Sequence, residues 1–125
     1  MFQKNEMVKA RKAVESMYSG TCTVTEHQKV KNTDKSTGFK DVVVLEDQPC
    51  RLSFKTISQT DPKETGASAM VQVIKLFIAP EIALKPGSKI TVTQNNVTTE
   101  FKNSGKSAVY TTHQEVILEL FDRWS

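Results

Sequence analysis

The chain has 125 residues, of which 38% are hydrophobic and 25% charged, with a formal net charge of +3. A single domain commonly has this size. Its folding should bury roughly two-thirds of the extended chain's surface, which is enough for a hydrophobic core without stabilising disulfides or metal ions. The composition excludes a disordered chain, and no apolar run approaches the ~20 residues of a membrane-spanning helix. We therefore expect a single domain over residues 1–125 and no membrane partner.

The N-terminal segment, residues 1–20, carries charged side chains throughout and lacks the apolar stretch of a secretory signal. We accordingly expect the protein to be made in the cytoplasm. In that compartment Cys22 and Cys50 are expected to be reduced, buried thiols.

Residues 3–19 have the apolar spacing of an amphipathic helix, and we assign residues 1–20 to an N-terminal helical segment. Its narrow apolar stripe, spaced by three and four residues, consists of Met7, Ala10, Val14 and Met17. Gly20 is expected to end the helix in a left-handed conformation. The stripe predicts packing either on the body of the domain or on a neighbouring subunit, and the pattern leaves both open.

After Gly20 the pattern changes to the alternation of a β-structure, which we expect to continue through residues 21–125. Residues 21–25 are rich in β-branched side chains, and the polar segment 29–40 predicts a loop or an extended hairpin tip. Pro49 indicates an edge position or a bulge, because proline cannot donate to a strand ladder. The next apolar residues alternate with polar ones: Cys50, Leu52 and Phe54.

The longest stretch without periodicity is residues 56–69, TISQTDPKETGASA. It predicts a long loop, and loops of this length inside a small domain more often have a function than serve only as connections. Plain surface disorder is the alternative. The polar candidates for an interaction loop are Thr56, Ser58, Gln59, Thr60, Asp61, Lys63, Glu64, Thr65 and Ser68.

Residues 70–78 predict a strand, and the segment Lys85-Pro86-Gly87-Ser88-Lys89 that follows has the residues of a phosphate-binding loop. Such a loop must lead into a helix whose free amides face the phosphates. Here alternating strand residues follow instead, from Ile90 onward. Proline and glycine at the second and third positions predict a type II turn. Nucleotide binding is therefore not expected at this segment.

A tight hairpin is predicted over residues 90–101, because Asn95 and Asn96 tolerate the positive φ angles of a two-residue turn. The predicted pairs are Gln94 with Val97, Val92 with Thr99, and Ile90 with Phe101. The core face of this hairpin is expected to carry Ile90, Val92, Val97 and Phe101.

Residues 103–106 predict a further turn, and the segment HQEVILELFDRWS that ends the chain fits a strand and a helix equally well. The whole indicates an α+β, mainly β fold. One N-terminal helix precedes about six or seven strands, which form a small, mostly antiparallel barrel or a sandwich.

No arrangement of residues predicts catalysis, a metal or a cofactor. Cys22, His27, Cys50 and His113 lack metal-ligand spacing, and a Cys–His hydrolase using Cys50 or Cys22 with His113 remains a minor alternative. The aromatic residues are scattered, and Phe54, Phe77 and Phe101 are expected in the core. A small nucleic-acid-binding barrel is the leading alternative function.

Several segments together resemble the head-closure (stopper) proteins of tailed bacteriophages. The residues that carry the resemblance are PCRLSFK (49–55), the long polar loop after it, VIKLFIAPEIALKPGSKITV (73–92) and HQEVILEL (113–120). The family pattern falls on Ile82 or Leu84, Gly87, Ile90, Val92 and Gln114-Glu115-Val116. The chain is most similar to the version in defective, phage-like prophage elements of Bacillus. The similarity covers roughly residues 20–120, and the N-terminal helix departs from the smallest members of the family.

The resemblance implies a non-enzymatic subunit of the phage neck, in a ring of several copies between the portal with its adaptor and the tail. It implies that the loop between the second and third strands, here Thr56–Ala69, projects inward to hold the packaged double-stranded DNA. It also favours a strand for residues 116–120. A ring is consistent with the modest net charge, because each contribution repeats around the axis.

Overall fold

The computed structural model describes residues 4–60 and 68–124; for Lys4 and residues 57–60 and 68–70 it describes the backbone only. Within these residues the chain forms one helix and six strands: α1 (Lys4–Glu15), β1 (Gly20–Lys31), β2 (Thr37–Thr60), β3 (Ser68–Ile78), β4 (Lys89–Gln94), β5 (Val97–Val109) and β6 (Gln114–Leu120). This confirms the mainly β fold with an N-terminal helix.

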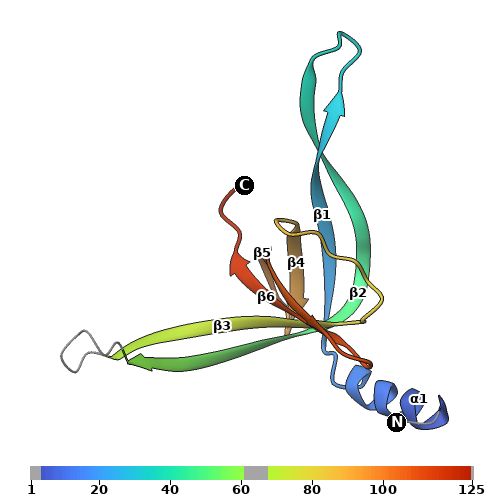
Figure 1. Ribbon diagram of the computed structural model, residues 1–125, viewed down its shortest axis with the longest axis vertical. Coiled ribbons are helices and arrows are strands. Elements are labelled where there is room, and N and C mark those ends of the chain that lie inside the picture. The colour runs from blue at the N-terminus through green and yellow to red at the C-terminus, as the bar shows by residue number, and fades with distance from the viewer. Residues whose placement is uncertain (1–3, 61–67, 125) are drawn as a thin grey trace.

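All six strands pair antiparallel in one sheet that closes into a barrel in the order β1-β2-β3-β6-β5-β4 (Figure 1). Successive side chains of a strand point to opposite faces, so every second residue enters the barrel. The buried core contains Cys22, Val24, Cys50, Leu52, Leu76, Ile78, Ile90, Val92, Phe101, Val116 and Leu118. The predicted small antiparallel barrel is therefore confirmed.

The β4–β5 hairpin has the predicted register, with Ile90 opposite Phe101, Val92 opposite Thr99 and Gln94 opposite Val97. Asn95 and Asn96 have φ angles of 53° and 63°, as a two-residue turn of this type requires. One detail of the prediction is wrong: Val97 is 62% exposed, because the end of the hairpin extends past the barrel interior.

The turn before β4 is also as predicted. Gly87 has a φ of 83°, and the amide of Ser88 donates to the carbonyl oxygen of Lys85 at 3.1 Å. The strand β4 follows directly, so the segment is a turn into a strand.

The longest strand, β2, has 24 residues. Its middle part belongs to the barrel wall, and each of its two ends continues into a projecting hairpin. Residues 37–50 of β2 pair with β1, and residues 51–60 pair with β3. Two ribbons result, which we name the β1–β2 arm (residues 26–42) and the β2–β3 arm (residues 55–73). Both project well beyond the barrel and point in different directions (Figure 1).

The β2–β3 arm corrects the predicted loop at residues 56–69. Strand pairing continues from Thr56 opposite Gln72 to Thr60 opposite Ser68, and only residues 61–67 lie outside the described part of the chain. No period of two appears in this sequence because a ribbon outside the barrel has no core-facing side. For the same reason Phe54, at the base of this arm, is 54% exposed although its alternation predicted a core position.

The N-terminal helix is shorter than expected. It ends at Glu15, and the amides of Met17 and Tyr18 then bond to the carbonyls of Val14 and Glu15, three residues back, at 3.1 and 3.0 Å. This tightened turn ends the helix, so the predicted role of Gly20 is wrong. Gly20 instead begins β1, where an added Cβ would lie 2.9 Å from the carbonyl oxygen of Thr93.

Three register shifts interrupt the ladders. Two lie between β1 and β2, on either side of Val24, and the one nearer Pro49 includes Asp47, which has a φ of 50°. The third replaces the turn expected at residues 103–106: β5 continues through this segment with a register shift and a φ of 87° at Gly105. Within the C-terminal segment, residues 114–120 form the strand β6, which pairs with β3 and β5, and the residues after Leu120 are not part of a strand.

Candidate functional site

Both arms project from the barrel, and the β2–β3 arm carries the predicted interaction loop (Figure 1). Of that loop, the paired part of the ribbon includes Thr56, Ser58, Gln59, Thr60 and Ser68. The remaining candidates, Asp61, Lys63, Glu64 and Thr65, lie outside the described residues. The structure thus places the described candidates on one ribbon at the end of a single arm.

The β1–β2 arm differs from the other arm in its charge. Its outer part, residues 28–40, contains four lysines and one acidic residue, Asp34: the lysines are Lys29, Lys31, Lys35 and Lys40. None of these ammonium groups forms an ion pair with another residue in the described ranges. Hydrogen bonds from the side chain and backbone of Ser36 lower the pKa of Asp34. The outer part of this arm is therefore basic, whereas Glu26 and Asp41 lie at its base. The sequence analysis did not identify this segment as a candidate site.

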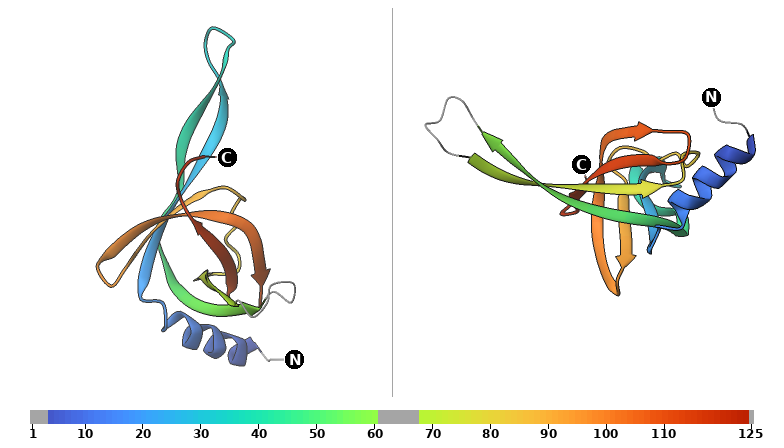
Figure 2. Two further views of the ribbon diagram at one scale, coloured as in Figure 1. Left: turned by 90° about the vertical axis from the view of Figure 1, so that its left-hand side faces the viewer. Right: turned by 90° about the horizontal axis from the view of Figure 1, so that it is seen from below.

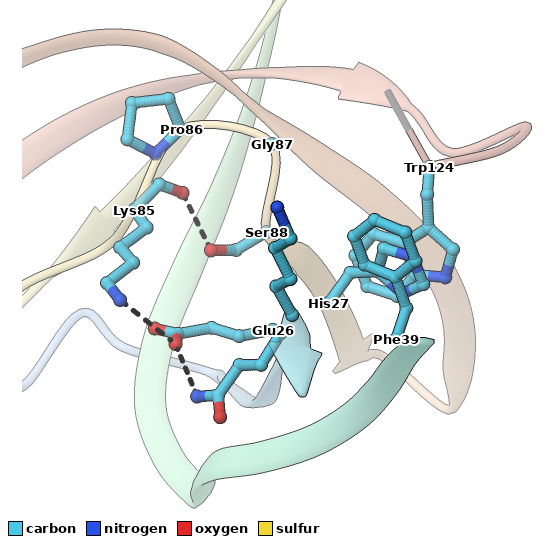
Figure 3. A pocket seen from close by; sticks show the side chains of 10 residues that line it. Glu26, His27, Phe39, Lys85, Pro86, Gly87, Ser88 and Trp124 are labelled. Atoms are coloured by element: carbon cyan, nitrogen blue, oxygen red, sulfur yellow. Dashed lines mark hydrogen bonds and ion pairs between the residues drawn. The ribbon is translucent and has the colours of Figure 1, made fainter. Parts of the chain in front are cut away.

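A three-ring stack lies at the base of the β1–β2 arm (Figure 3). His27 of β1 is sandwiched between Phe39 of β2 and Trp124 from the C-terminal segment, with ring centroids 4.6 and 4.9 Å apart. Phe121 meets Trp124 edge-on at 5.0 Å. These rings come from three separate parts of the chain, so no short sequence pattern could have revealed the cluster.

The stack borders a cleft of about 590 Å³. The turn Lys85–Ser88 lies across the cleft from the stack (Figure 3), and residues 26–29 of β1 also line the cleft. Lys85 reaches across to Glu26 at 3.6 Å, and Gln28 also donates to this carboxylate at 3.0 Å. Near the stack, the ammonium of Lys89 lies 5.7 Å from the centre of the Trp124 ring.

In the turn Lys85–Ser88, the backbone amides of Gly87 and Ser88 are both hydrogen-bonded within the protein, so neither is free to bind an anion. The amide of Gly87 donates to the carbonyl of Asn103 at 2.9 Å, and that of Ser88 donates within the turn. The prediction that this segment is not a phosphate loop thus agrees with the geometry. Cationic character in the cleft comes from lysine side chains alone.

The helix α1 contacts the barrel mainly at its C-terminal end. Arg11 forms an ion pair with Glu81 of the loop after β3, and Val14, Met17 and Tyr18 line a small groove with Phe77 of β3. The hydrogen bonds to Glu81 and Glu15 raise the pKa of Arg11. Of the predicted stripe, Ala10 and Val14 are half-buried, whereas Met7 and Met17 remain exposed. The helix thus keeps an apolar surface open.

The residues weighed as catalytic or metal-binding do not form a cluster in the described structure. Cys22 and Cys50 are buried in the core, and the hydrogen bond between their thiols, together with burial, raises the pKa of Cys22. His113 bonds to Thr112 and Glu115, each at 3.0 Å. Among the described residues, no group of three or more His, Cys, Asp or Glu side chains is placed to hold a metal ion.

Across the described residues, α1 is too short and too polar to cross a bilayer. No protein-family model matches the sequence, and no curated protein is similar to it. A solved structure with a similar course of the chain is that of the phage-like element PBSX protein xkdH from Bacillus subtilis. It has a TM-score of 0.47 and 12% sequence identity, and the match covers 80% of this chain and 91% of that chain. At these values we draw no conclusion about this chain from the likeness.

Proposed function

We propose that this chain is a structural subunit of a phage-like head–tail connector, the neck of the particle. Several copies form a ring that joins the head to the tail and closes the DNA channel. The subunit has no enzymatic activity of its own. It is made in the bacterial cytoplasm and assembled there into the particle.

The observation that carries this proposal is the β2–β3 arm. The sequence resemblance implies an element between the second and third strands that projects inward from a small barrel. In this chain β2 and β3 leave the barrel as a ribbon and stay paired to Thr60 and Ser68. A two-stranded ribbon holds its own backbone hydrogen bonds, so it can reach into a channel without support from the core.

The surface of α1 supports assembly with further copies. Met7, Val8 and Met17 are exposed apolar side chains on or next to a helix that touches the barrel mainly at one end. In the view from below, α1 and the β2–β3 arm lie on opposite sides of the barrel (Figure 2). A ring with the arm toward its axis therefore carries α1 toward its outside, where a neighbouring subunit can cover it.

The partners in this proposal are further copies of the chain, the portal or its adaptor on the head side, and the tail-completion proteins on the other. Packaged double-stranded DNA passes through the ring. The small net charge of +3 is multiplied by the number of copies, so that weakly basic subunits still form a basic ring as a whole.

The test shortens the arm without touching the barrel. Residues 58–70 are replaced by Asn-Gly, which leaves Ile57 opposite Val71 as the last pair and supplies a two-residue turn. The matched control replaces residues 30–38 of the other arm in the same way, after the pair of Lys29 and Phe39. Both variants should fold, because each removes only a ribbon outside the core.

Particles made with each variant are compared by electron microscopy and by their DNA content. The shortened β2–β3 arm should give heads that lose DNA or fail to join tails, and the shortened β1–β2 arm should retain DNA better. Full, tailed particles carrying the shortened β2–β3 arm would contradict the channel role. Failure of the unaltered protein to associate with purified necks would contradict the ring itself.

A further inference from the structure

The cleft at the base of the β1–β2 arm has features that the proposed neck role does not use. Its outer ring, Phe39, is 63% exposed although one face of the ring stacks on His27. A phenylalanine on an isolated ribbon gains little from such exposure in water. The ring is therefore available to a second flat group.

Strand alternation places basic groups beside this ring. His27, Lys29 and Lys31 share one face of β1, and their partners across the ribbon are Asp41, Phe39 and Thr37. Lys29 therefore lies directly opposite Phe39, with Lys31 next toward the tip. The acidic member of this face, Asp41, is engaged by His27 at 2.8 Å. A row of lysines thus leads from the aromatic stack along the arm.

Two further lysines lie at or near the cleft, each beside a carboxylate. Lys85 on the opposite wall is largely exposed and pairs with Glu26 at 3.6 Å. Lys89 pairs with Glu100 at 4.0 Å and packs over the rings of Phe121 and Trp124. Exposed aromatic faces next to lysines are the combination with which proteins bind single-stranded nucleic acids. Bases stack on the rings, and the ammonium groups pair with the phosphates.

We propose that this cleft and the adjoining lysine face of the β1–β2 arm bind single-stranded nucleic acid. One base stacks on the free face of Phe39, and the neighbouring phosphates contact Lys29 and Lys31. The site lies on the other arm from the one proposed to face the channel, so it does not depend on the neck assignment. An unpaired base is required, because a base inside a duplex cannot reach the ring.

The main experiment measures binding of a fluorescently labelled single-stranded oligothymidine to the full chain at low salt, by anisotropy. Phe39→Ala should weaken binding by about 5-fold to 150-fold, the range for loss of one stacked base. The matched control is Phe54→Ala, an exposed phenylalanine at the base of the other arm, which should leave the affinity unchanged. Phe39→Tyr keeps an aromatic ring and should restore binding. Circular dichroism checks that each variant is folded.

A second measurement tests the lysines through the salt dependence of binding. Lys29→Gln with Lys31→Gln should lower the slope of log affinity against log salt by about 0.7 for each lysine. Lys9→Gln with Lys12→Gln on α1 makes the same change in charge elsewhere and should leave the slope as it was. A duplex of equal length should bind more weakly than the single strand.

Several results would overturn the proposal. One is an unaltered chain that does not bind the single strand at low salt, in which case the cleft serves a protein partner or none. Another is an equal effect of Phe39→Ala and Phe54→Ala. Equal binding of duplex and single strand, unaffected by Phe39→Ala, would show attraction by charge alone and would remove the stacking site.

Discussion

The barrel and the arms of this protein are built from the same strands but stabilised in different ways. Along β2, Leu52 is 8% exposed, whereas Phe54, two residues on and on the same side of the strand, is 54% exposed. The first side chain belongs to the buried core of the barrel, and the second lies outside that core, at the base of the arm. An apolar residue therefore contributes to stability according to whether the barrel closes around it. Its hydrophobicity alone does not decide this.

The largest expected difference is between two phenylalanines. Phe101→Ala should lower the free energy of unfolding by about 3–5 kcal/mol, because the ring is 1% exposed and fills the barrel core. Phe54→Ala should change the same quantity by less than about 0.5 kcal/mol. Urea denaturation followed by circular dichroism measures both. Similar losses for the two variants would show that the arm base belongs to the cooperative core.

The second comparison concerns two asparagines. The buried side chain of Asn103 donates to the carbonyls of Leu84 and Lys85 at 3.3 and 3.0 Å and accepts from the amide of Gly105 at 2.8 Å. Asn103→Ala removes all three bonds, although the carbonyl of Lys85 still accepts from Ser88. The substitution should cost about 1–3 kcal/mol.

Asn32 at the tip of the β1–β2 arm serves as the control, since it bonds to Ser36 in an exposed position. Asn32→Ala should change the free energy of unfolding by about 0.5 kcal/mol or less. Thermal unfolding of both variants separates the two cases. A loss at Asn32 as large as that at Asn103 would mean that the arm tip unfolds together with the barrel.

The third comparison tests two turns with strained backbone. Asn96 in the β4–β5 hairpin and Lys35 at the tip of the β1–β2 arm have φ angles of 63° and 67°. Valine disfavours this conformation by about 1–2 kcal/mol. Asn96→Val should lower global stability by this amount, whereas Lys35→Val should only loosen the tip.

Amide hydrogen exchange distinguishes these outcomes. For Lys35→Val, faster exchange should be confined to the β1–β2 arm, with the barrel amides unchanged. Faster exchange throughout the barrel would show that the arm and barrel open as one unit.

The smallest effect is expected at the junction between α1 and the barrel, which belongs to neither region. Burial raises the pKa of Tyr18 above its usual value of 10.0, and its hydroxyl has no hydrogen-bond partner among the described residues. Above about pH 10 the unfolded chain loses this proton before the folded chain does. The stability linked to Tyr18 is therefore present below that pH and is lost as the pH rises through the raised pKa.

Tyr18→Phe should reduce the fall in stability between neutral pH and pH above 10, with little loss at neutral pH. Tyr110→Phe is the control, because Tyr110 is half exposed. Unfolding by urea at both pH values measures the difference. An unchanged alkaline fall in Tyr18→Phe would contradict the assignment.

The register of the β4–β5 hairpin was predictable to the residue because its determinants are local, although the exposure of Val97 was not. Two asparagines specify the turn, and the alternation after Ile90 specifies which side faces inward. The β2–β3 arm was missed for the opposite reason. Outside the barrel both faces of a ribbon meet water, so its residues carry no alternation even though the backbone is paired.

The candidate sites show the same division. The sequence located the β2–β3 segment as a candidate, although as a loop. It did not reveal the stack of His27, Phe39 and Trp124, whose members lie far apart along the chain. His27 and Phe39 meet across the β1–β2 ladder, whereas Trp124 follows β6, a strand that pairs with neither β1 nor β2, so its arrival depends on the whole barrel.

By itself the sequence determined the N-terminal helix, the strand class of the body, the turn at Gly87 and the register of one hairpin, because backbone preferences and side-chain alternation act over a few residues. Only the tertiary structure decided that residues 114–120 form a strand. Their sequence fits a helix and a strand equally well, and hydrogen bonding to β3 and β5 selects the strand. The tertiary structure also decided which apolar residues are core. Burial depends on closure of the barrel, and closure is a property of all six strands together.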